Sequence, residues 1–244
     1  MTSARVVEVG PEADLASSID LAAARAWFIG QGADAEGLRF DPLGVVRMPE
    51  LGQYRALGGL DRHPFNSQAL VEAALDRLDP AARRRVASPL IVVVPPGFRP
   101  HCWHLPGGVR RLAFAILPSD ATLGAIVHEL GHLLFDWPDL ERDSGLGNEC
   151  LMARGALLPE PAPPCAVLRL RAGWIAARSP ERSMRVDALA IGEAVKIGER
   201  VIERRRGPDR LLVLLDRPRP ILLRRIELRG EDLERPLLAV ARFG

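Results

Sequence analysis

The chain has 244 residues, which is enough for one large domain or two small ones, and 48% hydrophobic with 26% charged residues is typical of a globular protein with a buried core. A formal net charge of +2 argues against a dedicated nucleic-acid-binding protein. The first twenty residues lack the apolar core of a signal peptide, and no apolar run reaches the ~18 residues of a membrane span. We therefore expect a cytoplasmic protein with neither a nucleic-acid nor a membrane partner.

The first sixty residues predict a strand, a helix and a loop. Residues 5–9 indicate a short strand, and apolar residues at helical spacing indicate a helix over 14–29, ended by the glycines that follow. Residues 41–59 are rich in Gly and Pro, so we expect a loop with a short strand there. Because residues 1–60 contain no recognisable chemistry, they form an N-terminal segment of unknown role.

A helix, two strands and an intervening loop are predicted next. Asn66 is a good N-cap for a helix that runs through Leu78. The run PLIVVV at 89–94 is short, apolar and β-branched, which predicts a central strand buried on both faces. A loop over 101–108 and a strand over 109–117 then lead to the next helix.

That helix, within residues 121–139 (ATLGAIVHELGHLLFDWPD), places His128 and His132 four residues apart in an apolar run. Residues at this spacing lie on one helix face, roughly 5–6 Å apart at Cβ, so both imidazoles can bind one metal ion. Glu129 lies beside that ion, where its carboxylate can take a proton from a metal-activated water and pass it to the leaving amine. The pattern predicts a Zn²⁺ site with Glu129 as the catalytic base; the alternative is a chance match on a core helix.

The three cysteines, Cys102, Cys150 and Cys165, are odd in number and follow no metal-ligand spacing. This indicates reduced thiols and not a disulfide framework. Because Cys102 lies between two histidines in the sequence, a nucleophilic cysteine is an alternative chemistry.

The C-terminal part of the chain changes character after a proline-rich break. Residues 167–177 indicate a final helix or a buried segment. From residue 185 onward, short apolar runs alternate with turns, which predicts a β-rich region with its boundary near Pro180. The runs predicted as strands lie at 186–191, 194–197, 211–215, 221–228 and 237–241.

Two short motifs carry a resemblance to a known family. Residues 138–140 read Pro-Asp-Leu, and residues 151–155 read Leu-Met-Ala-Arg-Gly. Together with the apolar strand and the histidine helix, they resemble the immune inhibitor A-like metallopeptidases, a zincin family related to the metzincins, over residues 65–180 at most. In that family the Asp of Pro-Asp-Leu is the third zinc ligand, and the Met of Leu-Met-x-x-Gly forms a turn beneath the metal. The resemblance thus implies Asp139 as third ligand and Met152 as the turn methionine.

Two other carboxylates remain candidates for the third ligand. Phe135 stands where the family has a glycine turn, and Asp139 lies one residue further from His132 than in the family pattern. Asp136 is therefore one alternative. Glu149 is another, since zincins of a second clan take a glutamate ligand from a helix further along the chain.

We therefore predict an α+β protein: a zincin-like metallopeptidase domain over 1–180 with an active-site helix, followed by a β-rich C-terminal region over 181–244. Its predicted function is that of a zinc-dependent metalloendopeptidase acting on a peptide or protein substrate. The strand at 109–117 is predicted to be the edge strand that aligns this substrate.

An oxyanion donor is less evident in the sequence. The chain has a single tyrosine, Tyr54, far upstream, so a histidine of 101–104 or an arginine is the candidate. The alternative functions are a catalytically inactive zinc-binding scaffold, a protein-interaction module and a non-proteolytic hydrolase. The sequence leaves the oligomeric state and the substrate open.

Overall fold

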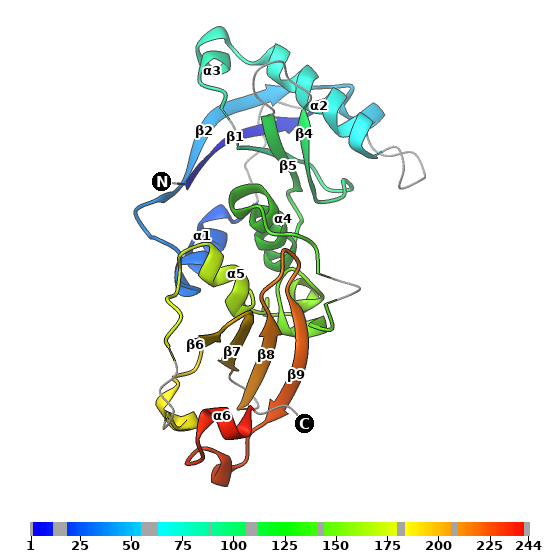
Figure 1. The fold of residues 1–244 in the computed structure, drawn as a ribbon. Helices are drawn as coiled ribbons and strands as arrows, with labels where there is room; N and C mark the ends of the chain where they lie inside the picture. The colour runs from blue at the N-terminus through cyan, green and yellow to red at the C-terminus, as the bar shows by residue number, and fades with distance from the viewer. Residues whose placement is uncertain are drawn as a thin grey trace. The chain divides into compact units, whose positions relative to one another are not determined.

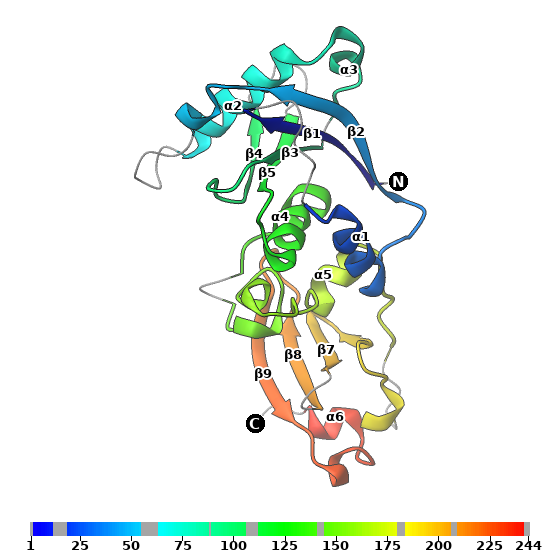
Figure 2. The same ribbon diagram turned by 180° about the vertical axis from the view of Figure 1, so that it is seen from behind.

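The computed structural model describes residues 2–11, 19–54, 63–87, 89–105, 112–140, 144–179, 184–205 and 209–241. The chain divides into two units, Met1–Asp136 and Trp137–Gly244. The boundary predicted near residue 180 lies inside the second unit. Both units combine helices with a β-sheet, which agrees with the predicted α+β class (Figures 1 and 2).

The first unit is built on a five-stranded sheet with the order β2-β1-β3-β5-β4. Its first four strands in this order run parallel, and β4 pairs antiparallel with β5. Because β3 lies at the centre, all five of its side chains are buried, and the predicted central strand is confirmed. The strands are β1 (Thr2–Gly10), β2 (Leu38–Arg47), β3 (Leu90–Val94), β4 (His101–Leu105) and β5 (Leu112–Pro118).

Two sequence-based predictions about this sheet are wrong. Residues 101–105, predicted as a loop, form β4, and the strand predicted at 109–117 appears as β5, which lies between β3 and β4 and is not at the edge. The edge strand is β4. Its sequence, HCWHL, lacks a long apolar run because a strand at a sheet edge buries little of its surface. The composition of β4 is therefore similar to that of a loop.

β2 is longer than the short strand predicted within residues 41–59, since it covers ten residues. Pro42 is tolerated because β2 is the other edge strand and needs no donor on its outer side. Gly44 has a φ of +143°, a backbone conformation that suits glycine, and the register between β1 and β2 shifts next to it. Gly and Pro here mark a bulged edge strand.

Helices cover both faces of this sheet (Figures 1 and 2). On one face, α2 (His63–Arg77) and α3 (Pro80–Arg84) pack apolar side chains against β1, β2, β3 and β5. On the other face, α4 (Leu123–Phe135) contacts β5, β4 and β1, and α1 (Leu21–Gly30) packs against α4. Asn66 lies inside α2 and is not its N-cap. α1 begins after Asp20, whose carboxylate accepts from the Ala23 N–H at 2.7 Å; part of the helix predicted at 14–29 lies outside the described residues.

The second unit contains a four-stranded antiparallel sheet with the order β6-β7-β8-β9. The predicted β-rich character after residue 181 is confirmed, but two predicted strands are not formed. Residues 186–188 are a short 3-10 turn, and the last run is helical. The elements are α5 (Ala166–Arg171), β6 (Ala194–Ile197), β7 (Arg200–Arg205), β8 (Arg210–Leu215), β9 (Ile221–Glu227) and α6 (Leu237–Val240).

The sequence analysis did not predict β7, because charged residues occupy some of its buried positions. Glu203 has no exposed surface and accepts hydrogen bonds from the Arg169 guanidinium at 2.5 Å and from the Ala166 N–H at 2.9 Å, while the Arg205 guanidinium lies 2.9 Å away. A buried carboxylate needs such partners.

Among the described helices, none is long and apolar enough to cross a membrane.

Candidate metal centre

The predicted histidine helix is confirmed as α4. Thr122 caps its N-terminus by accepting from the Ala125 N–H at 3.3 Å. Apolar residues on several sides of α4 are buried, including Ile126, Val127 and Leu130. His128, Glu129 and His132 are half-buried, so these polar groups face a partly solvated side of a helix that is otherwise packed.

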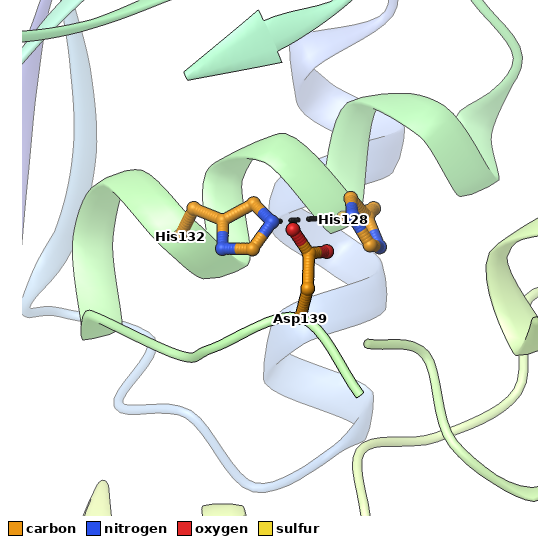
Figure 3. Close-up of side chains that lie close together, drawn as sticks. All are labelled: His128, His132 and Asp139. Carbon is orange, nitrogen blue, oxygen red and sulfur yellow. Dashed lines mark hydrogen bonds between the residues drawn. The ribbon is translucent and has the colours of Figure 1, made fainter. Parts of the chain in front are cut away.

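His128, His132 and Asp139 bring their ligand atoms together (Figure 3). The two Nε2 atoms are 3.2 Å apart, and each residue offers a ligand atom within 4.8 Å of the others. In a tetrahedral zinc site with bonds of ~2.0–2.1 Å, two ligand nitrogens lie about 3.3 Å apart. The donor set of two imidazoles and one carboxylate therefore fits Zn²⁺ in chemistry and in the spacing of the imidazoles.

The chain reaches Asp139 through a turn made by an aspartate. Phe135 ends α4 with its ring 5.4 Å from that of Phe28, and Asp136 follows with a φ of +53°. Aspartate is one of the few residues that adopt this left-handed conformation at moderate cost. Asp136 thus supplies the turn for which a glycine is expected one position earlier, and the additional residue before Asp139 is accommodated.

Neither rival for the third ligand belongs to the cluster found among the described residues. Asp136 is exposed and forms the C-cap of α4. Glu149 is 8% exposed, and its two carboxylate oxygens lie 2.7 Å from Arg210 Nη2 and 3.1 Å from Arg225 Nε. Both oxygens of Glu149 are thus used in ion pairs.

A turn centred on Met152 holds the segment that follows Asp139. The Leu140 N–H donates to the Met152 carbonyl at 2.7 Å, and the Met152 side chain is fully buried. The Cys150 carbonyl accepts from both the Ala153 and the Gly155 N–H at 3.0 Å, which closes the turn. The turn predicted at 151–155 is formed, and its backbone is bonded directly to the residue after Asp139.

Gly155 is required by the close packing of this turn. A Cβ at this position would lie 2.6 Å from the Cys150 carbonyl oxygen and 2.6 Å from the Ala162 Cβ. Real Cβ atoms do not approach backbone so closely, so the turn would have to move. The glycine of Leu-Met-x-x-Gly is thus explained by sterics.

We expect Gly155→Ala to lower the free energy of unfolding by about 3 kcal/mol, the upper end of usual overpacking costs, because rigid backbone and a neighbouring methyl group both oppose the added carbon. Denaturant titration followed by circular dichroism measures this change. Gly230→Ala, where a Cβ meets no atom within 4 Å, is the matched control and should change stability by less than about 0.5 kcal/mol. Equal effects of the two substitutions would contradict the steric explanation.

Glu129 and Cys102 lie near one another, since β4 packs against α4. Burial raises the pKa of the Cys102 thiol to about 12, and the negative charges of Glu129 and Asp136 add to this shift. A thiol with this pKa is protonated at neutral pH, which makes it a poor nucleophile. The alternative of a catalytic cysteine is therefore disfavoured.

The candidate oxyanion donors lie in different places. His101 Nε2 is 2.5 Å from Ser67 Oγ of α2, and its Nδ1 is 2.8 Å from the Arg99 carbonyl, so its ring is engaged on the α2 face of the sheet. Tyr54 packs against the core on that same face. Because side chains alternate along a strand, His104 lies on the same face of β4 as Cys102, and it is exposed.

The structure also reveals what the sequence interpretation missed. Residues 101–105 form β4, a strand that contacts α4, and the left-handed turn is made by Asp136. Comparisons of the chain with protein-family models, with curated proteins and with solved structures found no match.

Proposed function

We propose that this chain is a zinc-dependent metalloendopeptidase of the zincin type, with zinc held by His128, His132 and Asp139 and with Glu129 as the catalytic base. The observation that carries the proposal is the cluster of two imidazoles and a carboxylate, with Glu129 on the same helix. The cluster found among the described residues has three members. Three protein ligands and an open position are typical of catalytic zinc sites, whereas structural sites use four ligands.

The proposed mechanism assigns the proton transfers to Glu129. When bound, zinc supplies Lewis acidity, which lowers the pKa of a bound water to about 7 and polarises a carbonyl. Glu129 removes a proton from the attacking water and delivers it to the amine of the departing peptide. His128, His132 and Asp139 hold the ion, and none of them needs to change its protonation state during the cycle.

Substrate alignment is assigned to β4, the edge strand beside α4. An extended peptide can add to a sheet edge through main-chain hydrogen bonds, which recognises peptide backbone in general. Glu129 belongs to α4, which contacts β4. A peptide paired with β4 would thus pass near the helix that carries the proposed base.

Zinc content provides the direct test. Purified protein is expected to bind about one zinc per chain by elemental analysis after reconstitution and removal of loosely bound metal, as a single three-ligand site requires. The double variant His128→Ala/His132→Ala should bind none above background while remaining folded by circular dichroism. Failure of the unmodified chain to bind zinc would refute the proposed metallopeptidase function. Stoichiometric zinc without hydrolysis of any peptide library would instead support the inactive scaffold.

A further inference from the structure

Two buried cysteines lie side by side in the second unit. Cys150 and Cys165 have no exposed surface, and they are fifteen positions apart in the sequence. The Cys165 N–H donates to Cys150 Sγ at 3.3 Å. This contact places the Cys150 sulfur beside the backbone of Cys165.

The backbone around the two cysteines is already held together. The Leu151 N–H donates to the Pro163 carbonyl at 3.3 Å, and the Ala162 N–H donates to the Gly155 carbonyl at 3.1 Å. The segments 150–155 and 162–165 therefore lie side by side because of hydrogen bonds that do not involve sulfur. A covalent bond between the sulfur atoms would join two segments that are already adjacent.

The two thiols differ in acidity. Burial raises the pKa of Cys150, but hydrogen bonds from the Cys165 thiol and N–H, together with the charge of Arg205, outweigh this effect, and its pKa is lowered. Burial and the same thiol contact raise the pKa of Cys165. The Cys150 thiol is thus the more acidic of the two.

We propose that Cys150 and Cys165 are a redox-active pair that forms an intramolecular disulfide with hydrogen peroxide as the oxidant. The Cys150 thiolate attacks one peroxide oxygen, the O–O bond breaks, and hydroxide leaves, which gives a sulfenic acid at Cys150. Cys165 sulfur then attacks the Cys150 sulfur, and the sulfenic oxygen leaves as water together with the Cys165 proton. In sum, two thiols and one peroxide yield one disulfide and two waters.

This pair regulates the proposed metal centre, an extension that depends on the proposed function. Cys150 is part of the turn whose Met152 carbonyl binds the Leu140 N–H, and Leu140 follows the proposed ligand Asp139. A disulfide holds that turn closed. We expect zinc release, measured with a chromophoric chelator, to be slower in the oxidised protein than in the reduced protein, and equal rates would overturn this coupling.

The test uses the full chain with Cys102→Ser, so that Cys150 and Cys165 are the only thiols. The protein is treated with hydrogen peroxide in its native state, free thiols are alkylated after denaturation, and non-reduced peptides are mapped by mass spectrometry. We expect one cross-linked peptide, lighter by two hydrogens than its reduced parts. The melting temperature should rise by roughly 6–12 °C, and dithiothreitol should reverse this rise.

Cys165→Ala in the same background is the matched control and should show neither the cross-link nor the rise. Over-oxidation of Cys150 without a cross-link, or two thiols that stay reduced in the native state but react after unfolding, would overturn the proposal. The cross-link is mapped in both zinc-loaded and metal-free protein. A cross-link in a chain that binds no zinc would leave the cysteine pair standing and refute only the metal centre.

Discussion

Glu129→Gln is expected to lower the rate of peptide hydrolysis by about 10²–10⁴-fold, the usual contribution of a positioned general base. Glutamine has the same shape and keeps the helix, but it cannot accept the proton of the attacking water. Since Glu129 is not among the clustered ligand residues, zinc content should stay at the level of the unmodified chain. Hydrolysis of a quenched-fluorescent peptide library, with zinc measured on the same samples, checks both expectations.

The matched control for this variant is Glu160→Gln, which makes the same change at an exposed glutamate of the second unit. It should leave both the rate and the zinc content unchanged. If Glu129→Gln keeps most of the activity, a different group is the base and the assigned mechanism is wrong. If it loses zinc, Glu129 contributes to metal binding.

Asp139→Ala is expected to weaken zinc binding by more than the roughly 10–100-fold that loss of a supporting residue behind a metal ligand causes, because a ligand atom itself is removed. Competition with a chromophoric chelator measures the dissociation constant. The magnitude distinguishes a ligand from a residue that only positions one. A change of less than about 10-fold would exclude Asp139 as a ligand.

Two variants serve as controls for Asp139, one for each rival. Asp136→Asn removes the charge but keeps a side chain that tolerates the left-handed backbone at the end of α4. Glu149→Gln should lower stability, because Arg210 and Arg225 lose their charged partner, with zinc affinity little changed. If either control weakened zinc binding more than Asp139→Ala, the third ligand would have to be reassigned.

The elements that were predicted correctly depend on local information. The β-branched run of β3 is apolar at every position, so it specifies a strand buried on both faces. In α4, the spacing of His128 and His132 defines one face of a helix whatever surrounds it. The alternation of apolar runs and turns after residue 181 likewise predicts a β-rich region, although two of its predicted strands are not formed.

The errors fall where a distant partner sets the structure. β4 was mistaken for a loop because its five residues gain their conformation from pairing with β5, and an edge strand needs few apolar residues. The charges of β7 look solvent-exposed until Arg169, from α5, neutralises the buried Glu203. No short window of sequence contains both members of such a pair.

The same distinction between local sequence and tertiary contacts applies to the candidate site. Local sequence by itself determined the helix, the two imidazoles on one face and the adjacent Glu129, since a period of 3.6 residues fixes their relation. Only the tertiary structure decided that Asp139 joins the histidines, because that depends on the backbone angle of Asp136 and on the Leu140–Met152 hydrogen bond. It also placed Glu149 in ion pairs and packed β4 against α4. Helical spacing is local, whereas turns and strand pairing obtain their free energy from contacts between residues far apart in the chain.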